Sequence, residues 1–302
     1  MTQRFNHLSR RHFVASLAAA PLAFAAPEAN AEPIIDIHQH THYSGRSDED
    51  LIRHQREMGA TTTILLPAGS KYGLAADAYG NDSVVAIAKQ FPKQYYFFAN
   101  ELPDIPEAKP VIEKYLKMGA LGIGEQKFPV DIDSKSIDLI ARIAEEHRVP
   151  VLLHFEFKKY NLGIENYHKI IARYPKVNFI GHAQTWWANI DKNCEQEKLY
   201  PPGKVTPGGI TDRLLSDYPN VWGDMSAGSG LNSLTRDEEQ ARGFLERHQD
   251  RLLFGSDCND RQAGSPTCLG VKIIAAIRKL APNKKVERKI LYENSSKLFK
   301  IT

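Results

Sequence analysis

The feature that most constrains the fold is a regular alternation of short apolar segments with amphipathic segments. The apolar segments are brief and rich in β-branched and aromatic residues, which predicts buried strands. They lie at 34–40, 61–67, 95–100, 120–125, 150–154, 177–182, 221–225 and 252–257. Strands that are apolar throughout and separated by helices form a parallel sheet covered by helices.

Between and after these strands, capping residues and helical periodicity predict helices. These span 47–58, 81–91, 106–118, 136–147, 164–174, 211–217, 236–248, 269–280 and 285–299, and the longest irregular stretch is 185–209. The alternation over residues 32–302 favours one α/β domain, a (β/α)8 TIM barrel, since about 250 residues is typical of that fold. The last helix is expected to close the barrel. No Gly-x-Gly-x-x-Gly follows the first strand, which argues against a dinucleotide-binding fold.

Residues 1–31 have the three parts of an export signal. The run Ser9-Arg10-Arg11-His12-Phe13 resembles the twin-arginine motif, an apolar stretch covers 14–26, and Ala29-Asn30-Ala31 resembles a cleavage site. The apolar stretch is shorter than the roughly 20 residues of a membrane-spanning helix, so no stable membrane insertion is expected. The resemblance implies cleavage after residue 31, contact with the twin-arginine export machinery, and a periplasmic or secreted protein.

Charge and cysteine content narrow the possible partners. Three of the 39 basic and one of the 36 acidic residues lie in the first 31, so the remainder is nearly neutral and shows no nucleic-acid footprint. The cysteines are Cys194, Cys258 and Cys268. Either Cys258 and Cys268 form a disulfide or all three thiols are free, and the absence of Cys-x-x-Cys argues against a thiolate metal site. Nothing in the sequence indicates an oligomeric state.

Metal-ligand side chains stand where several predicted strands end. They are His38, His40, Glu125, His154, His182 and Asp257. In a (β/α)8 barrel these ends form the active-site face. Because side chains alternate along a strand, His38 and His40 point the same way, and two imidazoles of this kind bind a divalent cation. Zinc is favoured, with manganese and iron as alternatives. The histidines of the predicted helices, His54, His147, His168 and His248, are expected on solvated faces.

Several of these elements together resemble the metal-dependent amidohydrolase superfamily and its amidohydrolase-related branch. The elements are Asp36-Ile37-His38-Gln39-His40, His154, Gly181-His182, Gly255-Ser256-Asp257 and, in the closing helix, Asn294-Ser295-Ser296-Lys297-Leu298-Phe299. The resemblance implies that His38, His40, His154 and Asp257 bind the first of one or two metal ions. It gives Asp257 a proton-transfer role, and His182 either binds a second ion or polarises the substrate carbonyl.

The ligand on the fourth strand has alternatives. Glu125 and Lys127 are two residues apart, so both can face the barrel interior. Glu125 resembles a bridging glutamate of TatD-like hydrolases, whereas a carbamylated Lys127 would resemble the phosphotriesterase type. We favour Glu125, which lies nearer the strand end; the third possibility is that the two side chains pair without touching a metal.

Loops supply candidate substrate-binding residues. Trp186 and Trp187 follow His182, and they either form a wall for a small organic substrate or pack the long loop. Arg261 is a candidate carboxylate clamp, with surface exposure as the alternative, and His42 is a candidate substrate-side residue.

The favoured function is an exported metal-dependent hydrolase that cleaves a small ester, lactone or amide through metal-activated water. The first alternative is a non-oxidative decarboxylase of a small aromatic acid, and the second a non-catalytic metal- or ligand-binding barrel.

Overall fold

The computed structural model describes residues 32–69, 77–265 and 267–301, and the predicted export signal lies outside them. In chain order the strands are β1 Ile35–Gln39, β2 Thr62–Leu65, β3 Tyr95–Phe97, β4 Ile123–Gln126, β5 Val151–His154, β6 Phe179–His182, β7 Val221–Asp224 and β8 Leu252–Leu253. All neighbouring pairs are parallel, in the orders β1-β2-β3 and β4-β5-β6-β7-β8.

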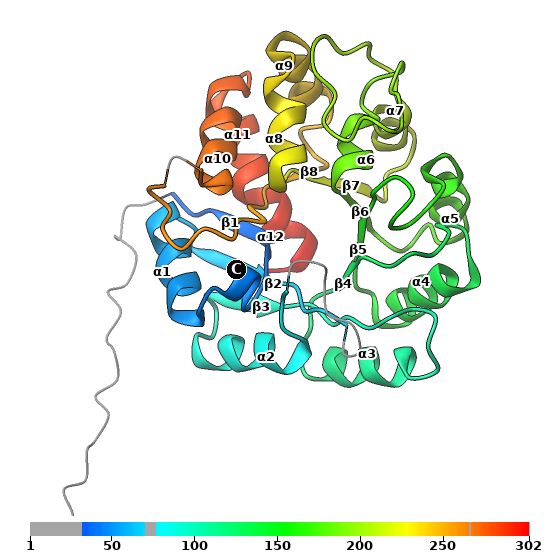
Figure 1. The fold of residues 1–302 in the computed structure, drawn as a ribbon, viewed down its shortest axis with the longest axis vertical. Coiled ribbons are helices and arrows are strands. Elements are labelled where there is room, and N and C mark those ends of the chain that lie inside the picture. The colour runs from blue at the N-terminus through cyan, green and yellow to red at the C-terminus, as the bar shows by residue number, and fades with distance from the viewer. Residues whose placement is uncertain (1–31, 70–76, 266, 302) are drawn as a thin grey trace, which may run out of the picture.

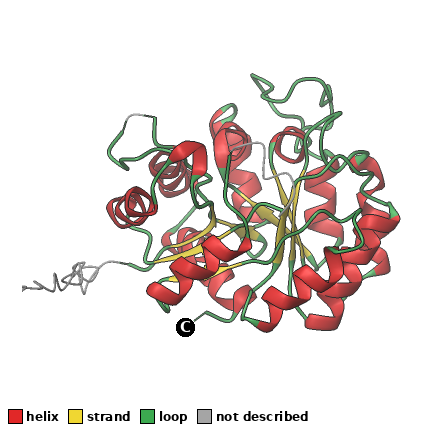
Figure 2. Ribbon diagram, turned by 60° about the horizontal axis from the view of Figure 1, so that its bottom comes forward, coloured by secondary structure: helices red, strands yellow, loops and turns green. Residues whose placement is uncertain are grey.

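Backbone hydrogen bonds join the two sheets into a closed barrel. Between β3 and β4, the amide of Leu121 donates to Phe97 O and that of Gly124 to Ala99 O, both over 2.9 Å. Between β8 and β1, the amide of Ile37 donates to Phe254 O over 3.1 Å. Figure 1 shows the strands as a central ring, and Figure 2 shows them enclosed by helices. The predicted TIM barrel is confirmed.

Most of the helices surround the strands, and the last, α12, lies across one end of the barrel. The helices are α1 Asp48–Met58, α2 Asn81–Gln90, α3 Ala108–Lys117, α4 Lys135–His147, α5 Tyr167–Arg173, α6 Gln184–Ala188, α7 Ile210–Asp217, α8 Ala227–Thr235, α9 Glu238–Arg247, α10 Leu269–Leu280, α11 Lys284–Arg288 and α12 Asn294–Phe299. Short 3₁₀ turns lie at Tyr43–Gly45 and Ile164–Asn166, and a π-helical turn at Lys289–Glu293. Within the described ranges, no helix has both the length and the apolarity needed to cross a bilayer.

The structure differs from the sequence-based expectation in three elements and in the burial of two histidines. The stretch expected to be irregular from 185 begins inside helix α6, and α8 was not predicted. The predicted helix 285–299 is α11, the π-helical turn and α12 in succession. Two helix histidines expected in solvent, His54 and His248, are buried, because each has a partner in the core: the thiol of Cys268 for His54 and the carboxylate of Asp212 for His248.

The C-terminal helix α12 packs against one end of the barrel. Asn294 donates from its amide to Leu252 O over 2.8 Å, which fixes the start of α12 at the start of β8. Phe299, 5% exposed, joins the cluster of interior barrel side chains, where its ring lies 5.7 Å from that of Phe98.

Replacing Phe299 with alanine should therefore destabilise the barrel. Truncating a buried phenylalanine leaves a cavity and typically costs about 3–5 kcal/mol of unfolding free energy. Chemical denaturation of Phe299→Ala would measure the loss. The control is Lys297→Ala on the same helix, because Lys297 is exposed and its substitution should change the unfolding free energy by less than about 0.5 kcal/mol.

Candidate metal centre

Strand β1 delivers two imidazoles to the barrel mouth. Its pairing with β2 shifts register between Asp36 and Gln39, so Ile37 stays in the inner core while His38 and His40 both face the centre of the mouth. The Nε2 atoms of His38 and His40 are 3.2 Å apart. His40 Nδ1 lies 2.8 Å from Leu66 O, which can only accept, so this nitrogen carries the proton and Nε2 is left free to bind a cation.

Two carboxylates face these imidazoles, Glu125 and Asp257. Glu125 Oε2 lies 3.8 Å from His38 Nε2 and 3.5 Å from His40 Nε2. Asp257 Oδ1 lies 3.8 Å and 3.6 Å from the same two nitrogens.

His182 completes the ring of donor atoms. Its Nε2 lies 3.6 Å from Glu125 Oε1 and 3.7 Å from Asp257 Oδ2. Bonds of about 2.0–2.2 Å from one metal ion, at angles of 90° to 120°, place neighbouring donor atoms about 2.8–3.8 Å apart. All of these separations lie in that range.

Several of the donor atoms are buried without a hydrogen-bond partner among the described residues. They are Glu125 Oε2, His182 Nε2 and Asp257 Oδ1. Leaving so many buried polar atoms unpaired in one place is costly, whereas a divalent cation would satisfy them. The donors are imidazole nitrogens and carboxylate oxygens, which suit zinc, manganese and iron. The residues present therefore fit a divalent metal ion.

The ionisation of the two carboxylates also fits a divalent metal ion. Burial raises the pKa of Glu125. The positive charge of Lys127 and the contact with His154 lower this pKa by more than burial raises it, so it lies well below the usual range. The pKa of Asp257 is also lowered, because the imidazoles of His38 and His40 outweigh its burial. Both carboxylates are thus held ionised, as metal ligands must be.

The structure places His154 differently from the predicted ligand. Its Nδ1 lies 2.5 Å from Glu125 Oε1, and its Nε2 faces Glu156 Oε2 at 3.6 Å. It falls outside both groups of converging donors at the mouth, His38–His40–Asp257 and His38–Glu125–His182. His154 therefore contacts the Glu125 carboxylate and is not itself one of the converging donors.

On strand β4 the geometry favours Glu125 over Lys127 as the ligand. Glu125 is one of the converging donors, whereas the ammonium of Lys127 lies 5.6 Å from the ring centroid of Tyr160. The charges of Glu125 and Asp257 raise the pKa of Lys127 more than burial lowers it. Lys127 is therefore a cation beside the site.

Two of the candidate substrate-binding residues, the adjacent tryptophans, lie in the core. Trp186 and Trp187 are almost fully buried; Trp186 stacks on Phe155, and Trp187 donates to Asp224 O over 2.8 Å. They pack beneath the loop and form no exposed wall, which corrects the substrate-wall interpretation. The aromatic surface of two adjacent tryptophans is more stable inside the core.

The other two candidates lie on loops. Arg261 is exposed, and its described contact is through its carbonyl oxygen, which accepts from Arg53 over 3.4 Å. This does not support a carboxylate clamp. His42 is partly exposed and stacks on Tyr79, with ring centroids 3.9 Å apart, which keeps it at the loop surface.

The sequence reasoning missed Asp224 at the end of β7. Its Oδ2 lies 2.6 Å from His38 Nδ1 and 3.3 Å from His182 Nδ1, and it accepts from the Ser226 hydroxyl over 2.9 Å. Burial raises the pKa of Asp224, but the two imidazoles lower it to about 2. An ionised carboxylate here holds protons on both Nδ1 atoms and turns both Nε2 atoms toward the metal position. Its position at a strand end was the signal available in the sequence.

Tyr43 was also missed, since it lies in a loop with no ligand-type spacing. Its ring meets that of His40 edge-on at 5.0 Å, and burial together with the negative charge of Asp257 raises its pKa. A protonated hydroxyl thus faces the carboxylate at the mouth. Asp257 has 12% of its side chain exposed, against 5% or less for the metal-site histidines, so the solvent side of the site lies here.

Comparisons with known proteins agree with this barrel. A family model described as amidohydrolase matches residues 35–301. No curated protein sequence matches the chain.

Solved structures show the same fold. An uncharacterized TIM-barrel protein from Bordetella bronchiseptica is 16% identical with a TM-score of 0.64, covering 89% of this chain and 98% of its own. A protein from Pseudomonas putida whose name proposes a 2-pyrone-4,6-dicarboxylic acid hydrolase is 15% identical with a TM-score of 0.61, covering 89% and 97%. The 5-carboxyvanillate decarboxylase from Sphingomonas paucimobilis is 15% identical with a TM-score of 0.55, covering 85% and 84%.

Proposed function

The chain belongs to the amidohydrolase family and is an enzyme of the metal-dependent amidohydrolase superfamily; from this premise we propose that it hydrolyses a small ester, lactone or amide. The observation that carries the proposal is the position of Asp257. Its carboxylate is ionised, has an unpartnered oxygen facing the converging imidazoles, and is the donor most open to solvent. This is where a general base for water is needed.

The residues that would hold the divalent ion are His38, His40, Glu125, His182 and Asp257. When bound, such an ion lowers the pKa of a coordinated water and polarises a carbonyl group. Zinc is our first choice, because imidazole and carboxylate donors at these separations suit it.

The protein side chains then divide the proton transfers. Asp257 accepts the proton of the attacking water and returns it to the leaving group. Tyr43, whose raised pKa keeps the hydroxyl protonated, can donate a hydrogen bond to the substrate oxygen beside Asp257. Asp224 stays ionised and holds the orientation of His38 and His182.

Decarboxylation of a small carboxylic acid is the second candidate, and Lys127 is the observation that favours it. Arg261 lies on the surface, but Lys127 is a cation whose pKa is raised by the charges of Glu125 and Asp257, and its ammonium could bind a substrate carboxylate. Two structural neighbours are named for carboxylated molecules, a pyrone dicarboxylic acid and 5-carboxyvanillate. A lactone that carries a carboxylate would satisfy both observations.

The test is a substrate panel assayed with metal-loaded and chelator-treated protein. It contains esters, lactones with and without a carboxylate, amides and aromatic acids, in water enriched in ¹⁸O. We expect metal-dependent turnover of a lactone or ester with one ¹⁸O atom in the acid product. Release of carbon dioxide without ¹⁸O incorporation would establish decarboxylation instead, and turnover that survives metal removal would contradict the proposed role of the ion.

We also propose that the enzyme is exported by the twin-arginine pathway to the periplasm or beyond. The proposal rests on Arg10, Arg11 and Phe13 and on the small residues Ala29 and Ala31.

A further inference from the structure

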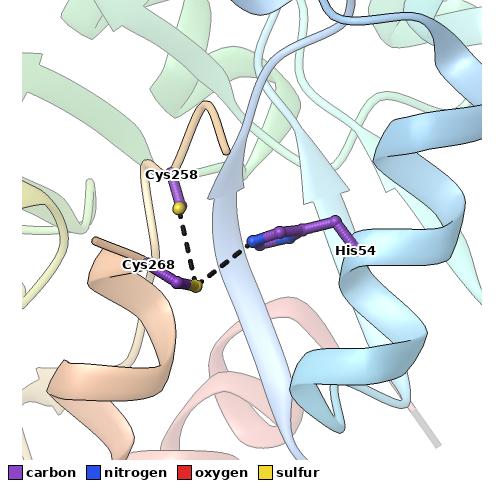
Figure 3. A group of neighbouring side chains, drawn as sticks. All are labelled: His54, Cys258 and Cys268. Atoms are coloured by element: carbon purple, nitrogen blue, oxygen red, sulfur yellow. Dashed lines mark hydrogen bonds between the residues drawn. The ribbon is translucent and has the colours of Figure 1, made fainter. Parts of the chain in front are cut away.

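A second group of metal-binding side chains lies apart from the mouth. His54 comes from α1, Cys268 precedes the first residue of α10, and Cys258 follows Asp257 (Figure 3). His54 Nε2 is 3.3 Å from Cys268 Sγ, and the two sulfurs are 3.7 Å apart. All three residues are at most 1% exposed, and their donor atoms lie within 4.8 Å of one another.

These separations match those of ligands around one thiophilic ion. Zinc bonds of about 2.3 Å to sulfur and about 2.0–2.1 Å to imidazole, at tetrahedral angles, place two sulfurs about 3.8 Å apart and a sulfur and a nitrogen about 3.6 Å apart. Within the described residues both thiols are free of disulfides. A disulfide would use the two sulfurs but gives no reason for the imidazole to converge on them.

The surroundings of His54 also suit a metal ligand. In the structure Gln55 Nε2 lies 3.4 Å from His54 Nδ1, and Gln55 Oε1 accepts from the hydroxyl of Thr63 over 2.9 Å. Because that hydroxyl can donate or accept, the amide can turn its oxygen to His54 Nδ1. The proton then sits on Nδ1, and Nε2 is free to bind a metal.

We propose that His54, Cys258 and Cys268 form a second metal site that takes a thiophilic d¹⁰ cation, Zn²⁺ or Cu⁺, with both cysteines bound as thiolates. The absence of Cys-x-x-Cys argued against such a site, but the fold brings together residues 214 positions apart in sequence. Binding releases the two thiol protons.

The site has a structural consequence for the mouth. The carbonyl of Cys258 accepts from Gln39 Nε2 over 3.0 Å and from Arg46 over 2.8 Å. An ion here joins α1 and α10 to the segment that begins at Asp257. It therefore holds that segment against β1 without touching substrate.

Cobalt(II) is the probe that tests the site, because thiolate ligands give a sulfur-to-cobalt charge-transfer band that nitrogen and oxygen ligands lack. Purified protein, reduced and freed of metal, is titrated with Co²⁺. We expect the charge-transfer band to reach the intensity of one thiolate-bound Co²⁺ per chain once this site and the mouth are both filled, and to be abolished in Cys258→Ser and in Cys268→Ser. The matched control is Cys194→Ser, which removes a thiol elsewhere and should keep the band.

A second variant separates this site from the mouth. His38→Ala removes a ligand of the mouth only, so it should keep the band while losing metal at the mouth. Circular dichroism checks that each variant is folded. Two results overturn the proposal: wild-type protein with fully reduced thiols that gives no charge-transfer band, or a band that persists when both Cys258 and Cys268 are replaced. Because the readout needs no substrate, it is independent of the proposed hydrolysis.

Discussion

Asp257→Asn should lower kcat/KM by about 10²–10⁴-fold, the usual contribution of a general acid–base group. Asparagine keeps an oxygen at Oδ1, the atom that faces His38 and His40, but its amide cannot take a proton from water. We therefore expect the folded variant to retain bound metal while losing turnover. Steady-state kinetics and metal content measured on the same sample separate the two effects.

The matched control for this substitution is Asp260→Asn. Asp260 is three residues further along the same segment, and its Oδ2 accepts from the Thr267 hydroxyl over 3.0 Å at the surface. Its replacement should leave kcat/KM within about twofold, since surface substitutions away from special features change little. Full activity in metal-loaded Asp257→Asn would assign proton transfer to another group.

The fold was predictable because the composition of the strands, the periodicity of the helices and their alternation along the chain all indicate the same architecture. Each predicted apolar segment overlaps a strand of the barrel, since β-branched and aromatic residues suit a parallel sheet buried on both sides. Helix α8 was missed because the run Ala227–Thr235 contains two glycines and two serines and only two leucines, so its periodicity is weak. Tertiary packing decides such a segment.

The candidate site was predictable where chemistry and position coincide. His38, His40, His182 and Asp257 are ligand types at strand ends, and the barrel brings them together. His154 obeys the same rule, yet its Nδ1 contacts Glu125 and its Nε2 faces Glu156, a rotamer choice that spacing along the chain does not encode. The burial of Trp186 likewise depends on Phe155 and Tyr167, which lie on other elements.

Asp224→Asn should weaken metal binding at the mouth by about 10–100-fold, the usual effect of losing a carboxylate behind a metal-binding histidine. Asp224 Oδ2 faces His38 Nδ1 and His182 Nδ1. If the amide nitrogen of asparagine takes that place, it donates to the imidazoles and drives their protons to Nε2, where they block the ligand lone pairs. Competition with a chromophoric chelator measures the affinity.

The control is Asp36→Asn, a second buried carboxylate, which lies on strand β1. Asp36 accepts from Ser256 N over 2.9 Å and from the backbone amide of His38 over 3.0 Å, and none of its described bonds reaches an imidazole ring. Both substitutions disturb a buried hydrogen-bond network and should lower the melting temperature. Metal affinity should fall strongly in Asp224→Asn alone, since only Asp224 sets which ring nitrogen carries the proton. Equal losses of affinity in the two variants would mean that Asp224 acts through stability and not through the orientation of the histidines.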